Sequence, residues 1–471
     1  MVYEEAVQTA GDLHQKAQTP DDQLHVLEMW NGLAAQNPQD PRPVYGMGVA
    51  LTVLDRSGVA MAVLAHGVEM APQVPHMWGA FGNVLRVNQH VEAARAAYAK
   101  AVEIAKGSDD PIGIDALVGL AGSYVNMGEP EKGIEYARQA VAKQESLSQA
   151  HNNLALLLLE QGEWVEGWEN YRLRVGLPGY HVRDYGCQSW EPGMKGLKRV
   201  YIHAEQGLGD EILYSSCLND FLADVGHVAL DGNDDLEIWG ECQERLIELI
   251  SRSFPEIKWF PTHDALMRGK EMESRPIPDE QCAFVPMGDL PYFYRHHPED
   301  CPGAPFLEVD PGKVEGYRAR LKTLGSGPYV GIAWRGGTVP THEALRNAPI
   351  PYWSGLVDKL KNKVKFVSVQ YGDKPIPHED VTEWKSVMQD LDEYAALISA
   401  LDAVVTCNQT AVHFAGALGV PCHTITPKEC AWRYCHERGD HQMVWYDSVK
   451  IHKGSWDEGF ASALADLKKL S

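Results

Sequence analysis

The sequence predicts an α + α/β protein, in which an array of helix pairs precedes two halves built on parallel sheets. Within positions 1–175, small and aromatic residues recur with a period of about 34, as they do where helix pairs stack on their neighbours. Beyond position 198, short apolar runs alternate with helical stretches, which is typical of strands joined by crossover helices. A chain of 471 residues is long enough for two or three domains.

The helical repeat is clearest in residues 120–140 and again about 34 positions later. Alanine and glycine recur there beside large apolar residues, so paired helices approach closely while the large side chains fill the gaps. Two earlier units follow the same pattern, with a turn-forming insertion at 107–111. These four units resemble the tetratricopeptide (TPR) repeat, and a degenerate fifth unit ends at Asn37-Pro38. The resemblance implies a TPR solenoid over 1–175 that either binds a peptide or partner protein or only supports the rest of the chain.

A Gly/Pro-rich linker is expected at 176–198, followed by Rossmann-like halves at 199–325 and 326–471. A Pro/Gly-rich break near 301–312 precedes the second strand series. The expected strands are 199–204, 227–230, 236–239, 257–260, 329–334, 364–369, 403–407 and 422–426, and the main helices are 211–224, 241–253, 352–361, 391–401 and 411–418. Because parallel sheets bind ligands beyond the carboxyl ends of their strands, the loops after these strands are where chemistry is expected.

Charge and composition exclude several function classes. The formal net charge of −23 repels phosphate backbones, so general nucleic-acid binding is not expected. The N-terminal residues lack the pattern of a secretory leader, and no apolar run is long enough to cross a membrane, so we expect a cytoplasmic protein. The nine cysteines form no CxxC pair, which favours free buried thiols over a disulfide framework.

The first candidate loop, at 205–210, contains Gly207, Gly209 and Asp210 between a strand and a helix. The glycines permit a tight turn that brings backbone N–H groups close to a ligand. The loop lacks the full GxGxxG dinucleotide fingerprint because Ile212 stands at its last position, and the chain has no GxxxxGK[ST] phosphate loop. Asp210 lies at the start of the helix, where an acid either caps the helix or takes part in chemistry.

The second candidate loop follows the predicted strand at 329–334 and contains Trp334 and Arg335, with Arg346 close behind. A guanidinium in such a loop suits bidentate contact with a phosphate, although an ordinary surface ion pair is the alternative. In the third loop, Asn408, Gln409 and Thr410 precede a helix of small residues. That helix begins with free N–H groups and the positive end of its dipole, and we expect Thr410 to cap it beside a diphosphate.

His413 lies one turn into the same helix, where it either packs in the interior or faces the ligand. Further motif residues follow in order along the second half of the chain. The motifs are EQGLGDEI at 205–212, GIAWRGG at 331–337, KFVSVQYGD at 365–373, TCNQTAVHFAGALGVP at 406–421, AWRY at 431–434 and SW at 455–456. Taken together they resemble glycosyltransferases of the GT-B fold, most closely the bacterial TPR-containing glycosyltransferases. A more distant resemblance links them to lipopolysaccharide heptosyltransferases and O-GlcNAc transferases.

The resemblance implies an acceptor side at 199–325 and a nucleotide-sugar side at 326–471. It assigns Asp210 as the base that deprotonates the acceptor hydroxyl, and it places the donor diphosphate at Thr410 with His413 and Arg346. The candidates for contacting the nucleobase and the sugar of the donor are Trp334, Gln370, Trp432 and Arg433. The other expected donor contacts are Gly207, Gly209, Arg335, Asn408 and Gln409. Many relatives carry an acid where this chain has Asn408, so the change removes a charge from the turn.

The expected function is therefore inverting transfer of a sugar from a nucleotide-sugar donor to an acceptor hydroxyl, with the TPR repeats recruiting the acceptor or a partner protein. No metal or other cofactor is expected, because the acidic segment at 231–235 is predicted to be a turn rather than a DxD metal motif. The Asn408-Gln409 departure favours an alternative, a catalytically inactive TPR adaptor with a degenerate transferase domain. A third alternative is another nucleotide-sugar enzyme, such as an epimerase.

Overall fold

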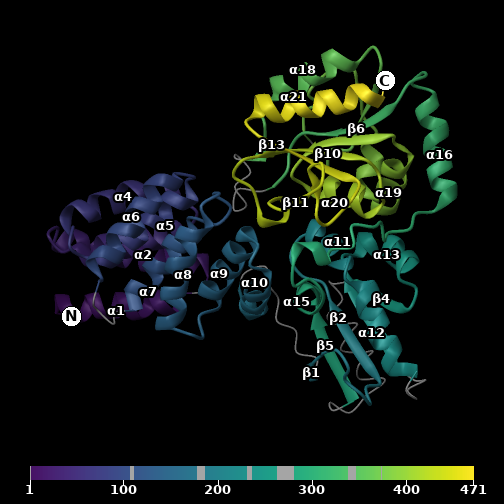
Figure 1. Cartoon of the computed structure of the whole chain (residues 1–471). Coiled ribbons are helices and arrows are strands. Elements are labelled where there is room, and N and C mark those ends of the chain that lie inside the picture. The colour runs from purple at the N-terminus through teal and green to yellow at the C-terminus, as the bar shows by residue number, and fades with distance from the viewer. Residues whose placement is uncertain are drawn as a thin grey trace. The chain divides into compact units, whose positions relative to one another are not determined.

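The computed structural model describes residues 2–17, 19–106, 111–177, 186–230, 236–261, 281–337, 346–372 and 374–470. The chain divides into two compact units, Met1–Leu157 and Leu158–Ser471, whose elements are labelled in Figure 1. Most of the insertion predicted at 107–111, the acidic turn predicted at 231–235 and part of the predicted linker lie outside the described residues. No helix in the described ranges combines the length and the apolar character needed to cross a membrane.

The first unit is an array of helices. They are α1 (Tyr3–Lys16), α2 (Pro20–Gln36), α3 (Pro41–Val53), α4 (Ser57–Met70), α5 (Pro75–Val87), α6 (Val91–Ile104), α7 (Pro111–Gly122), α8 (Pro130–Lys143) and the start of α9 (Ser148–Gln161). From α1 to α8, each helix packs against the next along the chain. Gly82 and Gly119 both lie against the ring of Tyr98, where a side chain on either glycine would collide with it. The predicted TPR-like helical array, with small residues at its helix contacts, is confirmed.

The second unit begins with the end of α9, then α10 (Trp164–Tyr171) and the short 3-10 helix η1 (Arg172–Arg174), and continues into two sheets. The first sheet is parallel throughout, in the order β1-β5-β2-β3-β4. Its strands are β1 (Gln188–Ser189), β2 (Arg199–His203), β3 (Glu237–Cys242), β4 (Ile257–Pro261) and β5 (Cys282–Pro286). From β2 the chain adds β3 and β4 on one side, and it then places β5 on the other side of β2. The loops after β2 and β5 therefore lie at a topological switch point.

The helices of this first sheet region correct two predictions. They are α11 (Leu208–Ser215), α12 (Leu218–Leu230), α13 (Ile247–Ser253) and α15 (Leu290–Tyr294). The strand predicted at 227–230 is wrong, because this short apolar run completes α12, whose buried Leu218, Phe221 and Val225 have helical spacing. The single helix predicted at 211–224 is two helices, α11 and α12. Strand β5 was not predicted.

The second sheet has the order β11-β12-β13-β10-β9-β6-β7-β8. Its parallel strands are β6 (Tyr329–Ala333), β7 (Lys365–Ser368), β8 (Val381–Thr382), β9 (Ala403–Cys407), β10 (Cys422–Pro427) and β13 (Val449–Gly454), and β11 (Glu437–Arg438) and β12 (Gln442–Met443) form an antiparallel edge. From β6 the chain adds β7 and β8 on one side, and it then places β9 on the other side of β6, so the loops after β6 and β9 lie at a topological switch point. The two sheets confirm the predicted α + α/β class, although β13 was not predicted.

Helices cover both faces of the second sheet. They are α16 (Pro311–Lys322), α18 (Ile350–Leu360), α19 (Leu391–Ala400), α20 (Thr410–Ala417) and α21 (Trp456–Leu467). Helix α16 falls partly within the predicted break near 301–312. Helices α18 and α21 lie over one face (Figure 1), where Trp353 and Phe460 pack into the same buried cluster as Ile332. The core of this half therefore lies between its central strands and these two helices.

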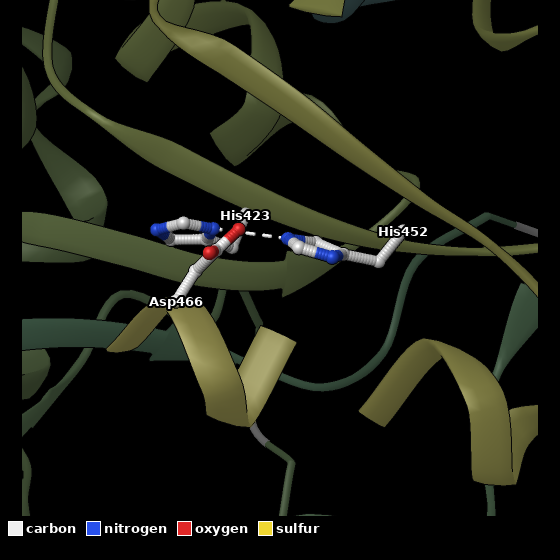
Figure 2. A group of neighbouring side chains, drawn as sticks. All are labelled: His423, His452 and Asp466. Atoms are coloured by element: carbon white, nitrogen blue, oxygen red, sulfur yellow. Dashed lines mark hydrogen bonds between the residues drawn. The ribbon is translucent and has the colours of Figure 1, made fainter. Parts of the chain in front are cut away.

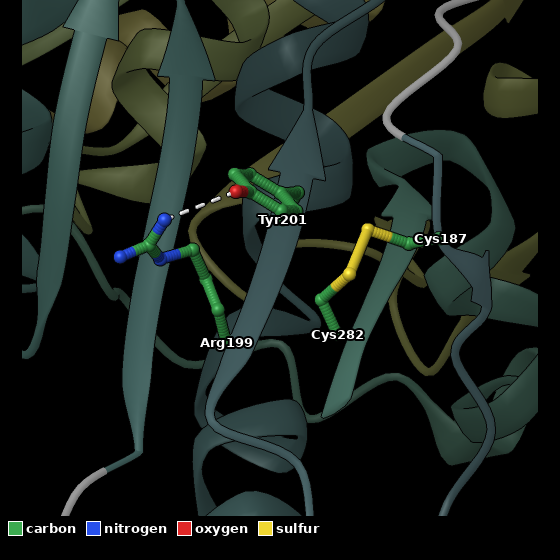
Figure 3. The surroundings of a disulfide bond; sticks show 4 residues. All are labelled: Cys187, Arg199, Tyr201 and Cys282. Atoms are coloured by element: carbon green, nitrogen blue, oxygen red, sulfur yellow. Dashed lines mark hydrogen bonds between the residues drawn. A yellow bond between two sulfur atoms is a disulfide. The ribbon is translucent and has the colours of Figure 1, made fainter. Parts of the chain in front are cut away.

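Cys187 and Cys282 form a disulfide that joins the segment before β1 to the first residue of β5 (Figure 3). The prediction of free thiols is therefore wrong for these two cysteines, and it holds for the other seven. The two residues are separated by 95 positions, so no local spacing motif marks them as a pair.

Candidate functional site

Asp210 lies in the loop that follows β2, at the switch point of the first sheet. Gln206 adopts a left-handed conformation with φ of 68°, and Gly207 is the N-cap of α11. The Asp210 carboxylate accepts a hydrogen bond from the Gly207 N–H at 3.3 Å, so Asp210, the third residue of α11, is not the N-cap but closes the start of the helix as the acid of a capping box does. Its side chain is 22% exposed and also forms an ion pair with Arg433.

Arg433 comes from the 3-10 helix η8 (Trp432–Tyr434), which follows β10 in the chain. Burial lowers the pKa of the guanidinium, but Asp210 together with the surrounding tyrosines (Tyr171, Tyr214 and Tyr434) raises it by more, so the net pKa of Arg433 is raised. Arg433 is therefore fully charged, and its ion pair holds the Gly-Asp loop against η8.

The loop after β9 lies at the switch point of the second sheet. Helix α20 begins at Thr410, and its N-cap residue, Gln409, makes no side-chain cap hydrogen bond. The expected Thr410 cap is wrong, since Thr410 is already the first helical residue. The Asn408 Oδ1 accepts hydrogen bonds from the hydroxyls of Thr424 and Thr426 at 2.9 and 2.8 Å, so the amide fixes the turn against β10. Neither Asn408 nor Gln409 therefore caps the first turn of α20 with its side chain.

The structure brings these two loops together, because α11 packs on α20. Gly209 lies so close to α20 that a Cβ there would be 3.0 Å from the His413 Cδ2 atom and 3.6 Å from the Thr410 Oγ1 atom. The predicted residues from the first and third loops therefore share one site.

His413 is buried within this contact. Its Nδ1 and Nε2 atoms each lie 3.2 Å from a tyrosine hydroxyl, those of Tyr446 and Tyr434. Burial lowers the pKa of His413 to about 4, so the imidazole is neutral at pH 7. With both ring nitrogens engaged, His413 packs inside the site, which contradicts the expectation that it contacts a diphosphate.

Arg346 is a second guanidinium in the same neighbourhood. Its side chain is half-buried, and it interacts electrostatically with Tyr434, Arg433 and Asp210. Burial lowers the pKa of Arg346, as expected for a cation that is removed from water without full compensation. Within the described ranges it makes no ion pair with a carboxylate. Among the described residues, Arg346 and Arg433 both lie near Asp210, so these three groups together carry a net positive charge.

Several other predicted donor contacts are used inside the protein. The Gln370 Oε1 accepts hydrogen bonds from the backbone N–H groups of Trp334 and Arg335 at 2.8 Å, and its Nε2 donates to two backbone carbonyls. The Trp334 indole is fully buried in the core of the second sheet, and the Trp432 indole is buried beside Trp168. The expectation that Trp334, Gln370 and Trp432 face a nucleotide base is therefore wrong. The Arg335 side chain is exposed.

A buried ionic network behind the Gly-Asp loop was not predicted. Arg174, which is 1% exposed, forms an ion pair with Glu205 and another with Asp289, where the Nη1–Oδ1 distance is 2.6 Å. Burial raises the pKa of Glu205, against the opposing effect of Arg174. The Gln206 side-chain amide also donates a hydrogen bond to the Tyr171 hydroxyl at 2.6 Å. These contacts fix the backbone that leads to Asp210. Glu205 belongs to the motif at 205–212, but Arg174 lies in no motif, so no sequence pattern indicated this ion pair.

A cavity of about 370 Å³ opens beside this network at the carboxyl end of β5. Its wall includes Glu169, Arg172, Trp190 and Tyr292, together with Asp289 of the ionic network. The Arg172 guanidinium lies 4.4 Å from the centre of the Tyr292 ring. A cavity with aromatic, acidic and cationic walls suits a polar ligand that also has an apolar face.

Comparison with known proteins finds a relative that matches most of the chain. No family model matches the chain. Protein FlbA from Caulobacter vibrioides is 27% identical over 459 residues, which cover 91% of this chain and 74% of that protein. Among solved structures, MamA from Desulfovibrio magneticus RS-1 is 21% identical with a TM-score of 0.30, covering 36% of this chain and 92% of that one. PilF from Pseudomonas aeruginosa is 11% identical with a TM-score of 0.36, covering 58% of this chain and 100% of that one.

Proposed function

We propose that the chain is an inverting, metal-independent glycosyltransferase of the GT-B type, which moves a sugar from a nucleotide-sugar donor to an acceptor hydroxyl. One observation carries the proposal. The loops at the two switch points meet, so that a carboxylate, Asp210, lies beside the start of α20 and two guanidiniums, Arg346 and Arg433. A transferase of this kind needs a base for the acceptor and positive groups for the departing diphosphate, and both are present here.

In this proposal the donor diphosphate binds at the first turn of α20 and to Arg346. The N–H groups of Thr410 and Ala411 and the helix dipole stabilise the negative charge that develops as the bond from the anomeric carbon to the phosphate oxygen breaks. The acceptor oxygen attacks the opposite face of that carbon and gives its proton to Asp210. The configuration is inverted, and the nucleoside diphosphate leaves.

The ion pair between Asp210 and Arg433 gives this mechanism an order of events. The Asp210 carboxylate is engaged by Arg433, so this contact has to open before the carboxylate can take a proton from the acceptor. A donor phosphate offers Arg433 a second anionic partner. Donor binding therefore draws Arg433 away from Asp210 and leaves the carboxylate free to accept a proton from the acceptor.

A thermal-shift screen with nucleoside diphosphates and nucleotide sugars tests the proposal. A true donor present at about 100 times its Kd should stabilise the folded chain by about 2.7 kcal/mol. The Asp210→Asn variant should keep this stabilisation and lose about 100-fold or more of the transfer rate. Glu256→Gln, which changes an exposed acid, is the matched control and should turn over normally. If no nucleotide stabilises the chain, the transferase proposal is wrong.

The alternative function is an inactive TPR adaptor. It is favoured by Asn408, whose amide oxygen is taken up by two threonine hydroxyls in place of the acid found in many transferases. An adaptor would bind a partner protein through the helical array and show no transfer with any donor. Nucleotide binding without turnover, unchanged by Asp210→Asn, would favour this alternative.

A further inference from the structure

His423, His452 and Asp466 form a cluster on the second sheet (Figure 2). His423 lies on β10 and His452 on the neighbouring parallel strand β13. The register pairs His423 with Lys450, two residues before His452, so both imidazoles lie on the same face of the sheet. Asp466 comes from the last turn of α21, which packs on this face. One ligand atom from each residue lies within 4.8 Å of the other two.

The two imidazoles are held in position by hydrogen bonds. The His423 Nδ1 lies 3.0 Å from the His452 Nε2, and the His452 Nδ1 lies 2.8 Å from the Ser462 Oγ. When the His452 Nδ1–H donates to Ser462, its Nε2 presents a lone pair toward His423. This is the arrangement of a metal-binding histidine, whose second nitrogen is oriented by an outer hydrogen bond.

A metal ion can take the place of the proton between the two rings. Tetrahedral coordination with Zn–N bonds of 2.0–2.1 Å places two ligand nitrogens about 3.3 Å apart. The nitrogens already lie 3.0 Å apart, so the rings need to separate by only a few tenths of an ångström. Asp466 then supplies a carboxylate oxygen from below, as its position in Figure 2 indicates.

Two lysines compete with such an ion for Asp466. The Lys450 Nζ lies 2.9 Å from one carboxylate oxygen and the Lys469 Nζ lies 2.6 Å from the other. Each lysine can move away from Asp466, because it has either a second carboxylate partner or open access to solvent. Lys450 also pairs with Asp440 at 2.6 Å, and the Lys469 side chain is 75% exposed. The lysines should therefore weaken metal binding without blocking it.

We propose that His423, His452 and Asp466 bind a divalent late transition-metal ion, with Zn²⁺ the preferred ion, between β10, β13 and α21. Imidazole nitrogen with one carboxylate oxygen suits zinc, and three protein ligands leave a fourth position for water. The ion would fasten the C-terminal helix to its sheet. It lies outside the proposed transfer chemistry, so the two proposals stand or fall separately.

Calorimetric titration of the chelator-stripped full chain with Zn²⁺ tests this proposal. We expect one ion per chain, with affinity reduced about tenfold or more in His452→Gln and in Asp466→Asn. Lys469→Gln removes a competing cation on the surface and should tighten binding. Ser462→Ala should weaken binding while leaving all three ligands in place. His441→Gln, an exposed histidine on the sheet edge, is the matched control and should bind like the wild type.

Cobalt distinguishes this site from a cysteine site, since Cys430 and Cys435 lie with their sulfurs 3.6 Å apart. Co²⁺ bound by His423, His452 and Asp466 should show d–d bands without a thiolate charge-transfer band. Wild-type stoichiometry and affinity in His452→Gln, a strong thiolate band, or no measurable Zn²⁺ binding would each overturn the proposal. Circular dichroism of the variants confirms that a lost signal reflects lost ligands rather than unfolding.

Discussion

At the scale of single residues, the candidate site is defined by its charges. Arg433 is paired with Asp210, whereas Arg346 is half-buried and makes no carboxylate pair in the described part of the chain. A cation held out of water without a partner raises the free energy of the folded state, and a bound anion relieves that cost. Arg346 is therefore the side chain whose contribution should differ most between the free and the ligand-bound protein.

Arg346→Gln should weaken binding of a nucleoside diphosphate by about tenfold or more, since hydrogen bonds to charged groups contribute about 1.5–3 kcal/mol. The same variant should unfold at the same temperature as the wild type, or slightly higher, in the absence of ligand. Calorimetric binding and thermal unfolding measure the two effects. Arg335→Gln is the matched control, because that side chain is exposed, and equal losses of affinity in both variants would contradict the role of Arg346.

His413 makes stability depend on pH. Its pKa is about 4 in the folded chain and about 6.5 when unfolded, so the unfolded state binds the proton more readily. Stability should fall as pH decreases from about 6.5 to about 4, by about 3 kcal/mol for this residue. His423 and His452, whose pKa values burial also lowers, act in the same direction. The free energy of unfolding, measured with urea at several pH values, should therefore depend less steeply on pH in His413→Gln than in the wild type. An unchanged pH dependence would contradict this assignment.

At the scale of elements, the contact between α11 and α20 depends on Gly209. A Cβ at this position would lie 3.0 Å from the His413 ring, closer than an ordinary packing contact. Gly209→Val should destabilise the chain by about 1–3 kcal/mol through overpacking and should also lower donor affinity, because the two loops separate. Gly209→Ala should have a smaller effect of the same sign.

Gly226 provides the control for this change, because it is exposed on α12 with open space around its Cα. Gly226→Ala should stabilise the chain by up to about 1 kcal/mol, as expected when alanine replaces glycine within a helix. Thermal unfolding measures the stability of the Gly209 and Gly226 variants, and nucleotide titration measures their donor affinity. Equal stability of Gly209→Val and the wild type would show that α11 and α20 do not need this close approach.

Much of the fold could be predicted from local pattern, and the remainder depends on distant contacts. Strand β9 was predicted to the residue because a buried apolar run ends in a polar turn, and the helical array follows from its period. The pairing of Cys187 with Cys282 spans 95 residues and leaves no local signal. Trp334 has the same sequence context whether it packs or stacks on a ligand, so its burial could not be predicted. The roles of Asp210 and Arg346 stay predictions.

At the scale of the whole molecule, α10 belongs to the second unit, although the sequence period assigns it to the solenoid. Trp164 stacks on Trp445 with ring centres 5.3 Å apart, and Trp168 meets Trp432 edge to face at the same distance. The hydroxyl of Tyr171 lies 2.8 Å from that of Tyr214. A boundary drawn at 175 would therefore remove part of the core of the second unit.

Two truncated chains test this boundary. The fragment 158–471 keeps α10 and Arg174, so it should be soluble and unfold cooperatively. The fragment 176–471 loses three buried aromatic side chains, each worth about 3–5 kcal/mol when truncated to alanine, against a typical total stability of about 5–15 kcal/mol. It also leaves the buried Glu205 and Asp289 without Arg174, at a further cost of about 3–5 kcal/mol. We expect 176–471 to aggregate or remain unfolded. Equal circular dichroism and protease resistance in the two fragments would show instead that α10 is dispensable, and that the sequence period had placed the boundary correctly.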